Sequence, residues 1–207
     1  MELGRKHIHF LGDSITYGIS ASSTSKSYVG LFRAQYPDAV IENYGVCGSC
    51  ISDKCIWNVE DMRTRARRMT LGADLIIISG GTNDFFCLAP LGQKFERRAD
   101  TFRGAYYLLL DDVEVRFAAA DIVLCTPPPR FDESCMERDG RVRFAPLCDY
   151  SEVVKEMGEY YHLPVIDLFS LDVFRSNNFD MTVDGLHPTD AGHEILFLYL
   201  RNALLNL

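Results

Sequence analysis

The chain has 207 residues, of which 47% are hydrophobic and 24% charged, and its formal net charge is -8. This length and composition are those of a globular domain with a sizeable core, and they exclude a disordered chain. The negative charge disfavours nucleic acid and anionic membrane surfaces as partners. We therefore expect a single domain over residues 1–207 that binds neither.

Five short apolar runs alternate with longer segments of helical spacing. The runs are HIHFLG at 7–12, AVIENYG at 39–45, ADLIIISGG at 73–81, ADIVLCTPP at 120–128 and LPVIDLF at 163–169. The predicted helices lie at 27–36, 61–69, 95–120, 149–161 and 188–205. Runs nearly continuous in Ile, Val and Leu are typical of strands buried on both faces of a parallel sheet. The alternation predicts an α/β fold with about five parallel strands and helices on both sides.

Residues 132–147 interrupt this alternation. Asp139-Gly140 lies there between two short runs, which predicts a β-hairpin insertion. The N-terminus has no apolar run typical of a signal peptide, and no run of about 18 apolar residues predicts a membrane span. We expect a cytoplasmic protein, and the sequence leaves its oligomeric state open.

The chain contains seven cysteines, an odd number that, without a secretion signal, argues against a disulfide framework. Cys47 and Cys50 have the CxxC spacing of a redox pair or of half a zinc site. No second CxxC and no HxxxH-type pair completes such a site. We therefore expect buried free thiols, no metal site and no cofactor.

Small and polar residues follow the predicted strands. In open parallel sheets, functional residues gather beyond the carboxyl ends of the strands. The segments at this rim are Gly12-Asp13-Ser14, Asn43 to Gly48, Gly80 to Asp84 and Asp184 to Pro188. Acyl transfer needs such a set: a hydroxyl nucleophile, an imidazole that removes its proton, and a carboxylate that orients the imidazole. A glycine N–H and an asparagine amide can stabilise the oxyanion.

The Asp184-to-Pro188 segment can present two of these groups together. Asp184 and His187 are three residues apart, so one loop can carry both. Pro188 suits the first position of the following helix, which would hold the histidine on a rigid element.

These segments, in this order, resemble the sequence blocks of the SGNH hydrolases, also called the GDSL esterase/lipase family. GDSIT is similar to the nucleophile block, NYGVCG to the glycine block, GGTND to the asparagine block and DGLHP to the aspartate-histidine block. The matches extend from Gly12 to Pro188. The resemblance implies a three-layer α/β/α sandwich of flavodoxin-like type and an enzyme that hydrolyses ester bonds.

The resemblance also implies roles for five residues. Ser14 would be the nucleophile, His187 its base and Asp184 the group that orients the base. The oxyanion hole would consist of the backbone N–H groups of Ser14 and Gly48 and the side-chain amide of Asn83.

The glycine block departs in part from the family pattern. The family places its donor at the later glycine, so Gly48 is chosen over Gly45. Ser49 and Cys50 follow Gly48, where the family often has Asp and then Thr or Ser. This departure bears on the geometry of the loop and leaves the backbone donor in place.

The expected substrate is a small-molecule carboxylic ester, either a small acyl or an acetyl ester, and an acetylated sugar follows from family analogy alone. The alternatives are a lysophospholipase- or thioesterase-type acyl hydrolase and a catalytically silent member that binds an acylated ligand. A flavodoxin-like nucleotide binder lacks the phosphate-cradling GxGxxG or Walker loop.

The remaining polar and aromatic residues are interpreted as structural. Asp13 is expected to organise its loop, and Asp84 to be structural or near the substrate. Arg63 to Arg68 is expected to be a solvated helix face, and residues 105–110 to belong to the core. The histidines outside the blocks are expected at the surface or in packing: His7, His9, His162 and His193.

Overall fold

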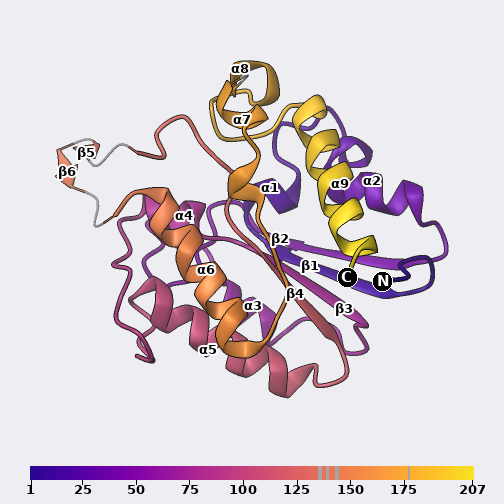
Figure 1. Ribbon diagram of the computed structural model, residues 1–207, viewed down its shortest axis with the longest axis horizontal. Coiled ribbons are helices and arrows are strands. Elements are labelled where there is room, and N and C mark those ends of the chain that lie inside the picture. Colours follow the sequence, from indigo (N-terminus) through magenta and orange to yellow (C-terminus); the bar gives the residue numbers. More distant parts are fainter. Residues whose placement is uncertain (135–136, 139, 143–144, 177) are drawn as a thin grey trace.

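The computed structural model describes residues 1–134, 137–138, 140–142, 145–176 and 178–207. A parallel five-stranded sheet with the order β2-β1-β3-β4-β7 runs through its centre (Figure 1). The strands are β1 (His7–Gly12), β2 (Val40–Gly45), β3 (Leu75–Ser79), β4 (Asp121–Cys125) and β7 (Val165–Ile166). The predicted parallel sheet is confirmed.

Helices cover both faces of this sheet. The helices are α1 (Ser14–Tyr17), α2 (Tyr28–Gln35), α3 (Met62–Ala66), α4 (Thr82–Phe86), α5 (Phe102–Arg116), α6 (Leu147–Tyr161), α7 (Val173–Ser176), α8 (Asn178–Met181) and α9 (Asp190–Leu205), with 3₁₀ turns at Thr24–Lys26 and Leu168–Ser170. Helices α3, α5 and α6 pack on one face, and α2 and α9 on the other (Figure 1). The expected three-layer α/β/α sandwich is confirmed.

Each strand supplies both layers because successive side chains point to opposite faces. In β1, Leu11 joins the core under α3, α5 and α6, whereas Ile8 and Phe10 join the core under α2 and α9. Two apolar faces explain why the runs around β3 and β4 are almost unbroken in Ile, Val and Leu.

Some predicted boundaries are wrong. The helix expected over 95–120 is α5 (Phe102–Arg116), which begins where the Thr101 hydroxyl accepts a hydrogen bond from the Gly104 N–H at 3.3 Å. The helix expected over 61–69 is the shorter α3. The Thr101 cap sets the first turn of α5, because it satisfies an N–H group that lacks an intrahelical partner. Helix α3 begins where expected, with Asp61 as its N-cap, and ends at Ala66 instead of Met69.

Two short strands lie within the expected insertion at 132–147. β5 (Glu137–Arg138) and β6 (Arg141–Val142) pair antiparallel, with Glu137 opposite Val142. Gly140 adopts φ +71° between them. Asp139, the other residue of the expected turn, lies outside the described residues.

The single domain expected over residues 1–207 stays a prediction.

Within the described part of the chain, no helix is long and apolar enough to cross a membrane.

Two buried tyrosines offer a test of the core between α5 and α6. The Tyr150 hydroxyl donates to the carbonyl of Ala89, whereas the Tyr106 hydroxyl has no hydrogen-bond partner among the described residues. Tyr150→Phe should lower the free energy of unfolding by about 1 kcal/mol, and Tyr106→Phe should leave it unchanged or raise it. Urea unfolding measures both, and a greater loss in Tyr106→Phe than in Tyr150→Phe would contradict this description of the core.

Candidate active site

Ser14 lies at the carboxyl end of β1, where the strand passes directly into α1. Asp13 caps that helix, its Oδ1 accepting a hydrogen bond from the Ile15 N–H at 2.9 Å. A Cβ at Gly12 would lie 2.0 Å from Oγ1 of Thr16, so only glycine fits so tight an exit from the strand. Asp13 therefore makes the loop-organising contact expected of it, and it directs the chain so that Ser14 begins the helix.

Asp184 and His187 approach Ser14 from the loop before α9. Nε2 of His187 lies 3.0 Å from Oγ of Ser14, and its Nδ1 lies 2.7 Å from Oδ2 of Asp184. The other oxygen of Asp184 accepts the backbone N–H groups of Leu186 at 3.0 Å and His187 at 2.8 Å. Both oxygens of one carboxylate thus hold the histidine, one through its ring and one through its backbone.

These contacts also set the charge of Asp184. Burial raises the pKa of its carboxyl, but hydrogen bonds from the backbone and ring of His187 outweigh this and hold the pKa below its usual range. The carboxylate is therefore ionised at neutral pH. An ionised partner at Nδ1 fixes the imidazole tautomer in which Nε2 can accept a proton.

The expectation for Pro188 is wrong. Helix α9 begins at Asp190, and Thr189 is its N-cap, accepting a hydrogen bond from the Gly192 N–H at 3.2 Å. Pro188 instead pairs in an isolated antiparallel bridge with Thr182, and the neighbouring Val183 N–H donates to the His187 carbonyl at 2.9 Å. This bridge, rather than a proline at the first helical position, holds the histidine loop.

Gly48 lies in the loop after β2, and Asn83 lies in α4, the short helix that follows β3. Gly48 has φ +77°, and a Cβ there would lie 3.0 Å from the indole of Trp57. Asn83 is the second residue of α4, and its Nδ2 donates to the Ser49 carbonyl at 3.0 Å. Because an amide nitrogen carries two hydrogens, this bond leaves one for another acceptor.

One cavity of about 550 Å³ brings the predicted residues together. Its lining includes all five predicted site residues: Ser14, Gly48, Asn83, Asp184 and His187. The four sequence segments that suggested the site therefore meet in space.

Asp84 of α4 anchors the loop that follows Gly48 through a buried carboxylate. Its carboxylate is buried and accepts the Ile51 N–H at 2.9 Å, the Ser52 N–H at 2.8 Å and the Ser52 hydroxyl at 2.6 Å. Burial raises the pKa of this carboxyl, although its three hydrogen bonds oppose the shift. Of the two roles expected for Asp84, these contacts are those of a structural residue.

Arg65 contradicts the prediction that residues 63–68 form a solvated helix face. Its guanidinium is buried, and Nη2 donates to the Gly12 carbonyl at 2.8 Å and to the Ser49 hydroxyl at 3.1 Å. The sequence spacing could have indicated this burial, because Met62, Arg65 and Ala66 lie at i, i+3 and i+4 and therefore share one face of the helix. All three are buried. Arg65 thus joins the end of β1 to the loop that carries Gly48.

Aromatic side chains form much of the cavity wall, and the sequence analysis missed them. Trp57 and Phe86 stack with ring centroids 5.2 Å apart and planes 18° apart. Arg130 and Phe131, just before the insertion, also line the cavity. Arg130 is buried, pairs with Asp132 and donates to the Thr82 hydroxyl at 3.2 Å. Trp57, Arg130 and Phe131 come from loops that carry no periodic pattern, whereas Phe86 is the last residue of the short helix α4.

The described cysteines form no disulfide. Cys47 and Cys50 of the CxxC pair are both free, and Cys47 lines the cavity. Cys50, Cys87 and Cys125 are buried as expected, whereas Cys148 is exposed. Cys135 lies outside the described residues.

Two of the histidines outside the site behave as expected. His193 is buried in α9, where its Nδ1 accepts the Tyr28 N–H at 3.4 Å and its Nε2 donates to the Ile19 carbonyl at 3.2 Å. His162 is exposed and ends α6 in the left-handed conformation.

The family model of the GDSL-like lipases/acylhydrolases matches residues 10–195. The chain therefore belongs to the GDSL-like lipase/acylhydrolase family, as the resemblance of its sequence blocks indicated. No curated protein sequence matches the chain.

Solved structures share this fold over nearly the whole chain. A Lactobacillus plantarum protein has a TM-score of 0.85 and 23% identity, over 99% of each chain. An acetyl xylan esterase has a TM-score of 0.67 and 19% identity, covering 95% of this chain and 98% of its own. A two-domain esterase active on acetylated mannans has a TM-score of 0.64 and 20% identity, covering 97% of this chain and 48% of its own.

Replacing Asp84 tests the support of the site. Asp84→Asn should lower the free energy of unfolding by about 1.5–3 kcal/mol, because an amide cannot accept on both sides as the buried carboxylate does. Urea unfolding measures the loss. Asp38→Asn, at an exposed carboxylate, should change the value by less than about 0.5 kcal/mol. If both variants were equally stable, Asp84 would not be the anchor described.

Proposed function

We propose that the protein is a serine esterase that hydrolyses a carboxylic ester through an acyl-enzyme intermediate. The observation that carries the proposal is the chain of contacts from Oγ of Ser14 through the ring of His187 to Asp184, with separations of 3.0 and 2.7 Å. A serine hydroxyl becomes a useful nucleophile only when a base takes its proton, and this geometry supplies the base and its orienting carboxylate. The same contacts favour an active enzyme over a catalytically silent ligand-binding member.

In the first half-reaction, Oγ of Ser14 attacks the carbonyl carbon of the ester. His187 takes the hydroxyl proton on Nε2, and Asp184 stabilises the imidazolium that results. The tetrahedral intermediate then collapses, the bond to the alcohol oxygen breaks, and His187 returns the proton to the departing alcohol. The acyl group remains on Ser14 as an ester.

In the second half-reaction, water replaces the alcohol. His187 removes a proton from the water, whose oxygen attacks the acyl carbon. Collapse of the second tetrahedral intermediate releases the carboxylic acid and returns the proton to Oγ of Ser14. Asp184 stays ionised throughout, and His187 is neutral again at the end of the cycle.

The oxyanion of each intermediate needs donors that are in position beforehand. We propose the backbone N–H groups of Ser14 and Gly48 and the Nδ2 group of Asn83. The bond from Asn83 to the Ser49 carbonyl supports this role, because it holds the amide still while one of its hydrogens stays available. Donors fixed in this way need no rearrangement as charge develops on the oxygen.

We propose a small acyl ester, in particular an acetyl ester on a carbohydrate, as the substrate. Support comes from the stacked Trp57 and Phe86 beside Ser14, because flat aromatic faces suit the apolar faces of sugar rings. Two structural neighbours are an acetyl xylan esterase and an esterase active on acetylated mannans.

An ester panel graded by acyl length tests the assignment. Preference for long-chain lysophospholipids or for thioesters would replace it with another acyl hydrolase activity.

Substitutions at Ser14 and Asn83 test the mechanism. With p-nitrophenyl acetate, Ser14→Ala should abolish turnover, and Asn83→Ala should lower kcat by about 10²–10³ with little change in KM, because an oxyanion donor acts mainly in the transition state. Ser25→Ala, at an exposed serine, should retain full activity. Equal turnover by wild type and Ser14→Ala would rule out Ser14 as the nucleophile, and a raised KM with normal kcat would make Asn83 a substrate-binding residue.

The pH profile tests the base. kcat/KM should rise between about pH 5 and about pH 8, because an imidazole can accept the Ser14 proton only in its neutral form. Asp184 should add no second rise in this range, since its pKa lies below the usual carboxyl value. Initial rates corrected for uncatalysed hydrolysis measure the profile, and a flat profile would exclude a histidine base.

A further inference from the structure

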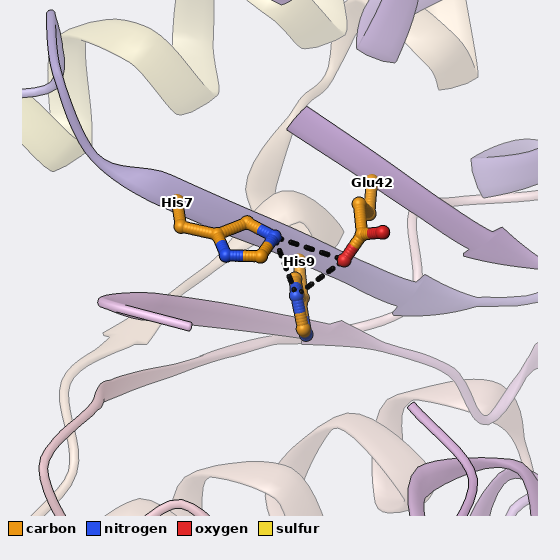
Figure 2. A group of neighbouring side chains, drawn as sticks. All are labelled: His7, His9 and Glu42. Carbon is orange, nitrogen blue, oxygen red and sulfur yellow. Dashed lines mark hydrogen bonds and ion pairs between the residues drawn. The ribbon is translucent and has the colours of Figure 1, made fainter. Parts of the chain in front are cut away.

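Three side chains with metal-ligating atoms meet on the amino-terminal halves of β1 and β2, away from Ser14. His7 and His9 are two residues apart on β1, so both project from the same face of the strand. The parallel register places His9 opposite Glu42 of the edge strand β2. Figure 2 shows the two imidazoles and the carboxylate pointing toward one another.

The separations are those of ligands around one metal ion. Oε2 of Glu42 lies 2.9 Å from Nε2 of His7 and 2.7 Å from Nε2 of His9, and the two nitrogens are 3.1 Å apart. With metal–ligand bonds of about 2.0–2.1 Å, two ligand atoms lie about 2.9 Å apart at a right angle and about 3.3 Å apart at the tetrahedral angle. An ion can therefore reach all three atoms after movements of a few tenths of an ångström.

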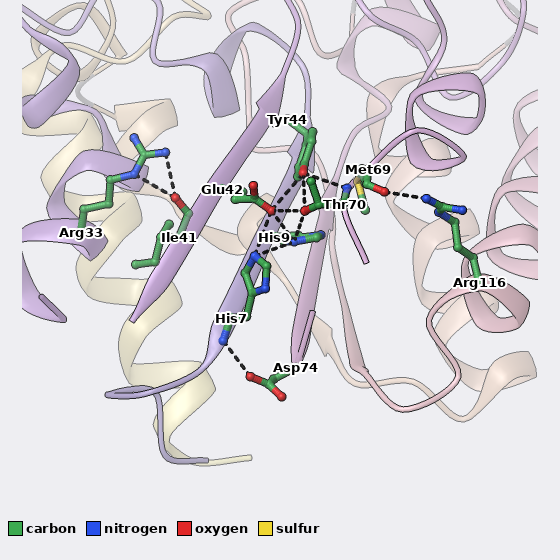
Figure 3. Close-up of polar contacts among 10 residues, drawn as sticks. All are labelled: His7, His9, Arg33, Ile41, Glu42, Tyr44, Met69, Thr70, Asp74 and Arg116. Atoms are coloured by element: carbon green, nitrogen blue, oxygen red, sulfur yellow. Dashed lines mark hydrogen bonds and ion pairs between the residues drawn. The ribbon is translucent and has the colours of Figure 1, made fainter. Parts of the chain in front are cut away.

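Hydrogen bonds alone satisfy this cluster poorly. Oε2 of Glu42 also accepts from the Tyr44 hydroxyl at 3.0 Å and from the Thr70 hydroxyl, so four polar groups converge on one oxygen (Figure 3). A carboxylate oxygen offers about two lone pairs. If both Nε2 atoms carried protons to reach Glu42, their two N–H groups would also face each other. A cation removes the second conflict, because it receives a lone pair from each Nε2 atom, and it reduces the first, because one ion then takes the place of two imidazole N–H groups at Oε2.

The burial and charge of the cluster suit a metal ion. His9 is fully buried, and its Nδ1 has no hydrogen-bond partner among the described residues. No donor to Nδ1 therefore holds the ring proton on Nε2, and the lone pair of Nε2 is open to a metal ion. Burial lowers the pKa of His9 despite the neighbouring carboxylate. A neutral imidazole and an ionised carboxylate are the forms that bind metals.

We propose that His7, His9 and Glu42 bind a divalent transition-metal ion, with Zn²⁺ as the best match to two imidazoles and one carboxylate. The ion fastens the edge strand β2 to β1 and supports the segment around Thr70. His9 and Ser14 are five residue steps of at most about 3.3 Å apart, an upper limit of roughly 17 Å between their Cα atoms. None of the three ligands lines the cavity that contains Ser14, so the ion takes no part in acyl transfer. This site replaces the expectation of surface or packing roles for His7 and His9 and of no metal site.

Calorimetric titration of the full chain with Zn²⁺, after treatment with a chelator and its removal, tests the proposal. We expect one ion per chain and a higher Tm with Zn²⁺ than without, because an ion that binds only the folded state stabilises it. His7→Gln and Glu42→Gln should each weaken the binding by more than about tenfold, since even residues that only orient metal ligands cost that much. Both side chains are partly exposed, so these conservative variants should fold, as far-UV circular dichroism will show.

His162→Asn is the matched control, because this exposed histidine lies outside the cluster and asparagine tolerates its left-handed backbone. It should bind Zn²⁺ as the wild type does. Folded wild type that binds no Zn²⁺, or unchanged binding by His7→Gln and Glu42→Gln, would overturn the proposal. Co²⁺ provides a measurement that needs no variant: visible bands without a thiolate charge-transfer band are expected, and a thiolate band would assign the ion to cysteines instead.

Discussion

The proposed active site depends on a contact between two residues that are 173 positions apart, Ser14 and His187. Ser14 is fixed by the exit of β1, and His187 by the loop before α9, so the contact requires α9 to dock correctly on the segment after α1. Two interactions do this. Asp190 accepts hydrogen bonds from the Ser22 N–H at 2.7 Å and from its hydroxyl at 2.6 Å, and the buried His193 donates to the Ile19 carbonyl at 3.2 Å. Helix α9 is thereby tied to the segment that follows Ser14 and α1.

The opposite wall of the cavity is held by two buried charged side chains. Asp84 binds residues 51 and 52 from α4, and Arg65 of α3 joins the Gly12 carbonyl to the Ser49 hydroxyl. The loop that carries Gly48 is thus fastened to the neighbouring strand ends on both sides. Ser49, where the loop departs from the family pattern, takes part in this arrangement, because its hydroxyl accepts from Arg65 and its carbonyl accepts from Asn83. The proposed oxyanion donors need a loop that is held in this way, since donors in a mobile loop would lose the advantage of fixed dipoles.

The sequence predicted what depends on local pattern. Apolar runs located the five strands, and parallel strands place their carboxyl ends at one edge, which is why residues from four segments could be assigned to one site before their geometry was known. Helix limits failed where a single side chain decides, as at Thr101 and Thr189. Arg65, Trp57 and the cluster of His7, His9 and Glu42 were missed because their roles arise from contacts between separate segments. Strand spacing shows that His7 and His9 share a face, but only the register of β1 against β2 places Glu42 beside them.

The central claim is that Ser14 alone is made nucleophilic by its neighbours. Labelling with a fluorophosphonate, followed by peptide mass mapping, tests it most directly, because the reagent reacts covalently with an activated serine hydroxyl. The account predicts one adduct per chain, on the peptide that contains Ser14, and a loss of esterase activity that parallels its formation. A chain that is denatured before the reagent is added should form no adduct. An inactivated enzyme whose label is on another residue, or an active esterase that takes up no label at Ser14, would contradict it.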